Sequence, residues 1–157
     1  MSSPGVAILL GLLDEAFEKK AWHGPNLRGA LRGLDARTAT KRPGPGRHSI
    51  QDLVVHAAYW KYTVRRRLTG EKKGSFLLEG SNFFERPATE AAFKADVALL
   101  VSEHRKLRAE VAKLRDRDLP RKTRGSAQTN LTVIRGIAAH DLYHAGQIQL
   151  LKRLVSD

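Results

Sequence analysis

The sequence predicts an all-α fold, a four-helix bundle formed by a single domain. Four long segments repeat apolar residues at intervals of three and four positions, the spacing that places them on one face of an α-helix. No segment alternates apolar and polar residues over the length of a β-strand. The 157 residues, 41% of them hydrophobic, are enough for one core. We therefore treat residues 1–157 as one domain, with a short extra helix between the first two long helices.

The first predicted helix runs from about Val6 to Ala21. Its expected buried side consists of Leu9, Leu12, Leu13, Ala16 and Phe17. The sequence Trp22-His23-Gly24-Pro25 should end this helix, because glycine and proline together favour a turn. Asn26 can then cap the short helix, which we predict for Leu27 to Leu34.

The second long helix is predicted to begin at Ser49. Ser49 followed by Asp52 resembles a capping box with a shorter carboxylate, and the helix extends to about Thr69 before Gly70 ends it. Its apolar stripe consists of Ile50, Leu53, Ala57, Trp60, Val64 and Leu68. His56 lies at the edge of this stripe. The segment from Glu71 to Pro87 contains three phenylalanines among glycines and polar residues, so we expect a loop held by aromatic anchors.

The third long helix is predicted from Phe93 to about Leu114. Its apolar residues alternate four and three positions apart, the heptad spacing of left-handed bundle packing. His104 occupies a position on this apolar seam. The helix should end near Arg115 to Asp118, where the apolar pattern stops.

The last long helix is predicted to begin at Thr129 or Asn130 and to reach about Val155. It carries His140 and His144, and positions i and i+4 of an α-helix share one face with Cβ atoms about 6 Å apart. Two such imidazoles can hold one metal ion. The same face carries Val133, Ile137, Ile148, Leu151 and Val155. An unpaired imidazole is costly in a core, so this pattern favours a metal site; two hydrogen-bonded core histidines are the alternative.

A third metal ligand must come from another helix. His56 is the first candidate, because it lies at the edge of the core with Trp60 beside it to limit the access of water. His104 is the second candidate. The alternatives for His104 are a polar core residue near one end of the bundle or a group that hydrogen-bonds a bound ligand.

Two residues beside the paired histidines are candidates to orient them. Asp141 can accept the remaining N–H of an imidazole, and Tyr143 flanks the second histidine. Ordinary surface or packing positions are the alternative for both residues. His23 and His48 lie at turns, and we expect them to be surface or capping residues.

The composition limits the possible chemistry. The chain contains no cysteine, which excludes disulfides, thiolate metal ligands and a cysteine nucleophile, so any thiol must come from outside. The 28 Lys and Arg residues exceed the 16 Asp and Glu residues, which gives a net charge of +12 with His neutral. The basic residues share their helices with core positions and few aromatic residues lie among them. We interpret them as solvated helix faces and do not expect a nucleic-acid partner.

No apolar segment approaches the roughly 20 residues that a membrane span needs. The apolar run from Gly5 to Leu13 has no preceding Lys or Arg and leads directly into acidic residues. We interpret it as a bundle helix and not as a signal peptide. These features predict a cytoplasmic protein without a membrane partner.

Two segments of the chain resemble the DinB/YfiT-like family of metalloenzymes. They are Leu53-Val54-Val55-His56-Ala57-Ala58-Tyr59-Trp60 and His140-Asp141-Leu142-Tyr143-His144-Ala145-Gly146-Gln147-Ile148. Trp22-His23-Gly24-Pro25, Arg67-Leu68-Thr69-Gly70-Glu71 and the order of the helices also recur in that family, so the resemblance covers nearly the whole chain. It implies a four-helix bundle in which His56, His140 and His144 hold one divalent metal ion. It also implies a homodimer.

The resemblance further implies an activity. Similar proteins include transferases that join a low-molecular-weight thiol, such as bacillithiol or mycothiol, to a small electrophilic substrate. The alternatives are a hydrolase that uses metal-bound water and a metal-binding stress-response module without catalysis. Three imidazoles leave coordination positions open and favour zinc or nickel over magnesium or calcium. The catalytic residues themselves stay unassigned.

Overall fold

A computed structural model describes residues 1–156 and shows a bundle of four long helices. The long helices are α1 (Pro4–Phe17), α4 (Ile50–Thr69), α5 (Glu90–Ala112) and α6 (Asn130–Val155). The short elements are α2 (Leu27–Ala30), α3 (Ala36–Ala39) and the 3₁₀ turn η1 (Asp116–Asp118). Within residues 1–156 the chain forms no strand, only one isolated bridge between Lys122 and Thr129. The predicted all-α bundle is therefore confirmed.

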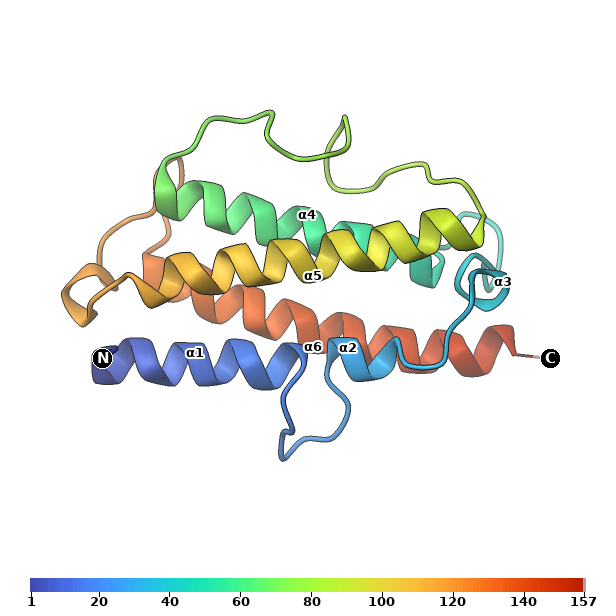
Figure 1. The fold of residues 1–157 in the computed structure, drawn as a ribbon, viewed down its shortest axis with the longest axis horizontal. Coiled ribbons are helices and arrows are strands. Elements are labelled where there is room, and N and C mark those ends of the chain that lie inside the picture. The colour runs from blue at the N-terminus through green and yellow to red at the C-terminus, as the bar shows by residue number, and fades with distance from the viewer. Residues whose placement is uncertain (157) are drawn as a thin grey trace.

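The helices are arranged so that α1 and α4 each pack against both α5 and α6. Figure 1 shows α1 and α6 running in one direction and α4 and α5 in the other. Because α4 and α5 follow one another and are parallel, the segment 70–89 must return along the bundle, and it does so over the outer side of α4. We call residues 70–89 the crossover segment. No helix of the described chain is long and apolar enough to cross a membrane.

Local capping explains where the helices begin. The Ser49 hydroxyl accepts the N–H of Asp52, whose carboxylate accepts the N–H of Ser49, so the predicted capping box begins α4. The Thr129 hydroxyl accepts the N–H of Thr132 and begins α6. Gly70 has a φ of 75°, the left-handed conformation that ends a helix, and it ends α4.

The predicted end of the first helix is wrong. The structure ends α1 at Phe17 and not at Ala21, because the chain leaves the bundle there in a turn. After the turn, α2 continues in line with α1 and packs against α6 (Figure 1). The Asn26 side chain holds this turn by donating to the Lys19 carbonyl at 2.8 Å. The expected burial of Leu12 is also wrong, since its side chain is 42% exposed.

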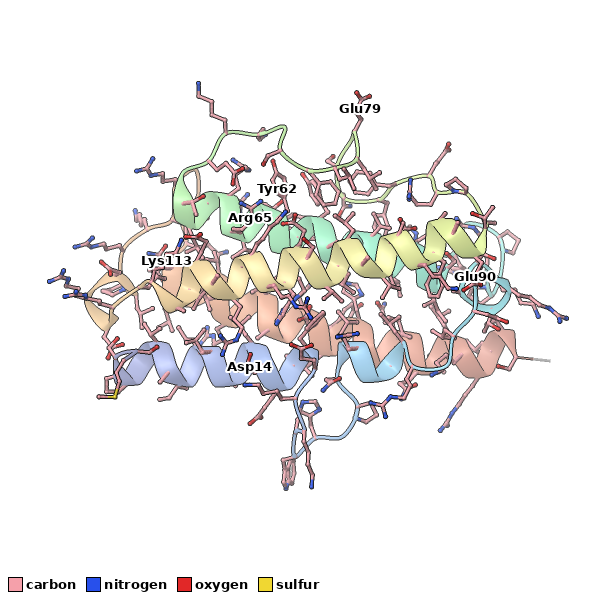
Figure 2. All side chains as sticks on the ribbon, viewed as in Figure 1. Asp14, Tyr62, Arg65, Glu79, Glu90 and Lys113 are labelled. Atoms are coloured by element: carbon pink, nitrogen blue, oxygen red, sulfur yellow. The ribbon has the colours of Figure 1, made fainter. Side chains whose placement is uncertain are left out.

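Two further boundaries differ from the prediction because of contacts between distant residues. The short helix α2 ends at Ala30 and not at Leu34, and α3, which was not predicted, begins after Asp35 caps it through the N–H of Thr38. The helix α5 begins at Glu90, three residues before the predicted start. The Glu90 carboxylate accepts the N–H of Ala36 at 2.9 Å, and Figure 2 shows it beside the α3 turn.

The core consists of two apolar clusters at opposite ends of the bundle. One cluster contains Phe17, Leu27, Ile50, Leu53, Ala58, Leu100, Ala145 and Ile148 among its buried residues. The other contains Val6, Leu13, Val64, Leu107, Val111, Ile134 and Ala138. Buried polar side chains lie between the two clusters along the helices, as described below.

Candidate metal centre

Three of the predicted residues meet at one point between α4 and α6. The Nε2 atom of His140 lies 3.1 Å from Nε2 of His56 and 3.0 Å from Nε2 of His144. One nitrogen from each ring falls within 4.8 Å of the others, so the three residues can hold one metal ion. His56 and His144 are buried and His140 is half-buried. The i, i+4 spacing on α6 thus brings two rings together, and the packing of α4 supplies the third.

The outer nitrogens of two rings are held by oxygen acceptors. Nδ1 of His56 lies 3.1 Å from the carbonyl oxygen of Asn82, and Nδ1 of His144 lies 2.6 Å from Oε1 of Gln147. Since these oxygens only accept, each Nδ1 carries the proton and each Nε2 keeps its lone pair directed at the centre. Nδ1 of His140 is buried and has no hydrogen-bond partner among the described residues. The Nε2 lone pairs of His56 and His144 therefore both face Nε2 of His140, and one divalent metal ion bound to all three nitrogens fits this donor set.

Burial keeps the three rings neutral. It lowers the pKa of His140 from 6.5 to about 3 and that of His144 to about 4, and it lowers the pKa of His56 as well. Neighbouring histidines lower the pKa of His140 further. Neutral imidazole is the form that binds metal, so the site is ready for an ion at neutral pH.

These shifts predict that the metal-free protein loses stability in acid. In the unfolded chain the histidines have their ordinary pKa of 6.5, whereas folded His140 titrates near 3. Between these values the unfolded chain binds more protons, so the free energy of unfolding should fall as the pH drops from about 6.5 to about 3. Urea unfolding at several pH values measures this slope. His140→Gln is the control: its slope should be smaller, and an equal slope would contradict the prediction.

The crossover segment covers the centre through Asn82 and Phe83. Among the described non-glycine residues only Asn82 has a positive φ, 65°, a conformation that asparagine tolerates better than most residues. Its carbonyl holds His56, and its side-chain oxygen accepts the indole N–H of Trp60 at 3.0 Å. The Phe83 ring stacks on His56 at 4.4 Å and on His48 at 3.7 Å. Sequence reasoning missed Asn82, and its only signal for Phe83 was the expected aromatic anchoring of the loop.

Trp60 and Tyr143 lie beside the centre. The Trp60 ring approaches His56 and His140 edge-on, with centroid distances of 6.3 and 6.5 Å. The Tyr143 hydroxyl accepts a hydrogen bond from Gln147 at 3.4 Å, and Gln147 in turn holds His144. Tyr143 therefore contacts His144 edge-on, at a centroid distance of 5.2 Å, and also reaches it through Gln147, for which the sequence predicted no role.

The expectation that Asp141 accepts an imidazole N–H is wrong. Its carboxylate accepts a hydrogen bond from Lys61 Nζ at 2.5 Å, and both side chains are completely buried. His104 does not join the metal centre either, since its Nδ1 lies 3.2 Å from Lys61 Nζ. The reason is helical geometry: Asp141 follows His140 and so points about 100° around α6, into the middle of the bundle.

The other two histidines lie outside the centre. His23 is exposed in the turn after α1. His48 is exposed beside Phe83, and its Nδ1 lies 3.7 Å from the Asp52 carboxylate.

A pocket of about 370 Å³ lies next to the metal centre. Its lining includes Leu53 and Gln147, three residues before His56 and three after His144. Arg47, His48, Leu150 and Leu151 complete most of the wall. A larger pocket, about 750 Å³, lies at the turn between α1 and α2 and contains none of the three histidines. We relate the chemistry to the smaller pocket, because Gln147, whose side chain holds His144, is part of its lining.

Comparison with protein-family models gave a match that includes the three histidines. A family model described as the DinB superfamily matches residues 21–148, which include α4, α5, most of α6 and all three histidines of the centre. No curated protein and no solved structure matches the chain.

Proposed function

The chain belongs to the DinB superfamily, and on that basis we propose that it is a metal-dependent enzyme that joins a low-molecular-weight thiol to an electrophile. The observation that carries the proposal is the convergence of the three neutral histidines, His56, His140 and His144. Three protein ligands leave coordination positions open, as in catalytic and not structural zinc sites. Imidazole donors favour zinc or nickel as the ion.

An ion in this site would lower the pKa of a thiol or a water molecule at its open position. In the proposed reaction a carbon–sulfur bond forms, the leaving group departs with its bonding electron pair, and the thiol proton passes to solvent. The chain's own contribution is to orient the ligands: Asn82 and Gln147 hold His56 and His144 in one tautomer. Trp60 and Phe83 shield the rings from water on the side of the crossover segment.

The adjacent pocket supports a small substrate with an apolar part and a negative group. Leu53, Leu150 and Leu151 supply an apolar wall. The Arg47 guanidinium is exposed at this pocket and forms no ion pair within residues 1–156. A single cation beside an apolar wall attracts a carboxylate or a similar anion. Since the chain contains no cysteine, the thiol must be a second substrate.

The proposal includes a cytoplasmic homodimer with no nucleic-acid partner. Outside that pocket, the neighbouring helices α1 and α6 carry several large exposed apolar side chains: Ile8, Leu12, Leu131, Leu142 and Leu154. A second copy of the chain packed on this side would remove part of that apolar surface from water. Sedimentation of the purified protein tests this part, with an expected mass of twice 17.5 kDa; a mass of one chain at micromolar concentration would contradict it.

The activity is tested with zinc-loaded protein and simple probes. We expect 2-mercaptoethanol and 1-chloro-2,4-dinitrobenzene to give thioether and chloride at a rate that depends on the protein, the thiol and the metal. A chelator should abolish this rate. His23→Ala is the matched control, because it removes an exposed histidine outside the centre and should leave the rate unchanged.

Two other results would replace the proposal. Hydrolysis of 4-nitrophenyl acetate that needs metal but no thiol would identify a hydrolase. Bound metal with no turnover of either probe pair would identify a metal-binding module without catalysis. Turnover that continues after complete removal of the metal would contradict metal dependence itself.

A further inference from the structure

All four long helices contribute a side chain to one buried contact in the middle of the bundle. Lys61 of α4, His104 of α5 and Asp141 of α6 are each 0% exposed, and we call these three residues the central polar cluster. Lys61 Nζ lies 2.5 Å from Asp141 Oδ2 and 3.2 Å from His104 Nδ1. The Phe17 ring of α1 stacks on His104 at 3.8 Å and lies 4.9 Å from Lys61 Nζ.

The central polar cluster separates the two apolar halves of the core. On each helix, its residue lies between a member of one apolar cluster and a member of the other. The flanking pairs are Ala58 and Val64 on α4, Leu100 and Leu107 on α5, and Ala145 and Ala138 on α6. The polar contact is therefore a layer across the bundle and not an extension of the metal centre.

Stability does not explain this layer. Removing two charges from water is expensive, and well-packed apolar residues in their place are often neutral or stabilising. The layer also leaves two buried polar atoms, Oδ1 of Asp141 and Nε2 of His104, without a hydrogen-bond partner among the described residues. A buried ion pair can instead specify how two helices are rotated and shifted relative to one another, because its contact forms in only one such arrangement.

The alignment in question is the one that forms the metal centre. Lys61 and Asp141 lie on α4 and α6, the two helices that carry the three histidines. Asp141 directly follows His140, so the two side chains point about 100° apart around α6. When Asp141 points into the middle of the bundle and contacts Lys61, His140 points to the edge of the bundle and contacts His56. A rotation of α6 by one residue, or a shift by one turn, breaks the Lys61–Asp141 contact and separates the histidines together.

We propose that Lys61 and Asp141 are positioning residues, whose buried contact sets the register of α6 against α4 and so brings His140 and His144 to His56. This inference rests on the three-histidine metal site of the proposed function. It assigns to the central polar cluster a role that is distinct from metal binding itself, since none of its members is in the three-histidine group.

The test replaces the ion pair by apolar residues, Lys61→Met/Asp141→Leu, and measures metal binding separately from folding. We expect cooperative melting at or above the wild-type temperature, because no buried charge is left unpaired. We expect cobalt(II) to bind about 10- to 100-fold more weakly, the range seen when outer partners of a metal site are lost, and with an altered visible spectrum. In the metal-free variant, NMR contacts between the ring protons of His56 and His140 should weaken.

The matched control is Asp14→Leu/Arg108→Met, which removes an ion pair between α1 and α5 that contacts none of the three histidines. Its cobalt affinity and spectrum should equal those of the wild type. Unchanged cobalt affinity, spectrum and ring contacts in Lys61→Met/Asp141→Leu would overturn the inference and leave the proposed function standing. A wild type that binds no cobalt would instead overturn the proposed function. The NMR contacts between the rings of His56 and His140 in the metal-free proteins would then still test whether the ion pair sets the register of α6 against α4.

A second variant covers the case in which the apolar pair does not fold. Lys61→Gln/Asp141→Gln removes both charges, shortens the first side chain by one atom and lengthens the second by one, so that the two amides can still form a hydrogen bond. We expect it to bind cobalt almost as tightly as the wild type, because a polar contact still specifies the same register. Affinity as weak as that of a variant lacking a histidine ligand, in a protein with wild-type helix content, would overturn the inference.

Discussion

His140→Ala should abolish stoichiometric metal binding, with a loss of zinc affinity greater than about 100-fold, the upper range for residues that only support a ligand. His140 lies between the other two ligands, with its Nε2 3.1 Å from that of His56 and 3.0 Å from that of His144. Without it only two imidazoles remain, on different helices. Elemental analysis of protein purified without a metal-affinity column, together with competition against a chromophoric chelator, measures the loss.

The fold should survive this substitution. His140 is half-buried at the edge of the bundle, and its Nδ1 forms no hydrogen bond among the described residues, so the polar contacts that its removal breaks are those of its Nε2 with the other two rings. His23→Ala, the exposed control, should retain near one equivalent of metal. Retention of one equivalent by His140→Ala would contradict the assigned ligand set. Absence of metal from the wild type, with no uptake on titration, would indicate that the three histidines are polar residues of the core edge.

Lys61→Met alone should destabilise the protein by about 3–5 kcal/mol, because it leaves the Asp141 carboxylate buried without a partner charge. Burial raises the pKa of Asp141 and lowers that of Lys61, and their mutual attraction opposes both shifts. Removing the lysine removes that attraction while the burial remains. Urea unfolding at pH 7 measures the free energy of unfolding of the metal-free variant and wild type.

The size of this effect depends on burial, so an exposed pair provides the comparison. Lys113→Met breaks the ion pair between Lys113 and Glu110, in which the lysine side chain is 68% exposed. This substitution should lower the free energy of unfolding by no more than about 1 kcal/mol. Adding Asp141→Leu to Lys61→Met should recover most of the lost stability. A loss below about 1 kcal/mol for Lys61→Met would show that water or a neighbouring group reaches Asp141, and would contradict the completely buried pair.

The elements that the sequence predicted well depend on neighbouring residues. The capping box at Ser49 and the cap at Thr129 each join residues only three positions apart, so they can be predicted from the local sequence. The pairing of His140 with His144 follows from the period of a single helix. His56 was found because it lies at the edge of an apolar stripe, although the stripe alone does not show which helix it faces.

The predictions that failed depend on contacts between distant residues. The turn that ends α1 is held by Asn26 donating to the Lys19 carbonyl, and α5 begins early where Glu90 accepts the N–H of Ala36. Asn82 is 26 residues from His56 along the chain, and nothing in the loop sequence marks its carbonyl as a partner. The same holds for Lys61 and Asp141, since the period of α6 alone does not show that Asp141 faces a lysine.

By itself, the sequence determined that this protein is an all-α bundle and that two histidines of its last helix share one face, because both follow from the local geometry of the α-helix. Only the tertiary structure decided that His56 joins the two histidines of α6 and that Asn82 and Gln147 fix the tautomers of His56 and His144. It also decided that Asp141 pairs with a buried lysine and not with an imidazole. These contacts depend on the rotation and register of α4 and α6. A one-residue turn of about 100° leaves the hydrophobic pattern recognisable but changes which polar side chains meet.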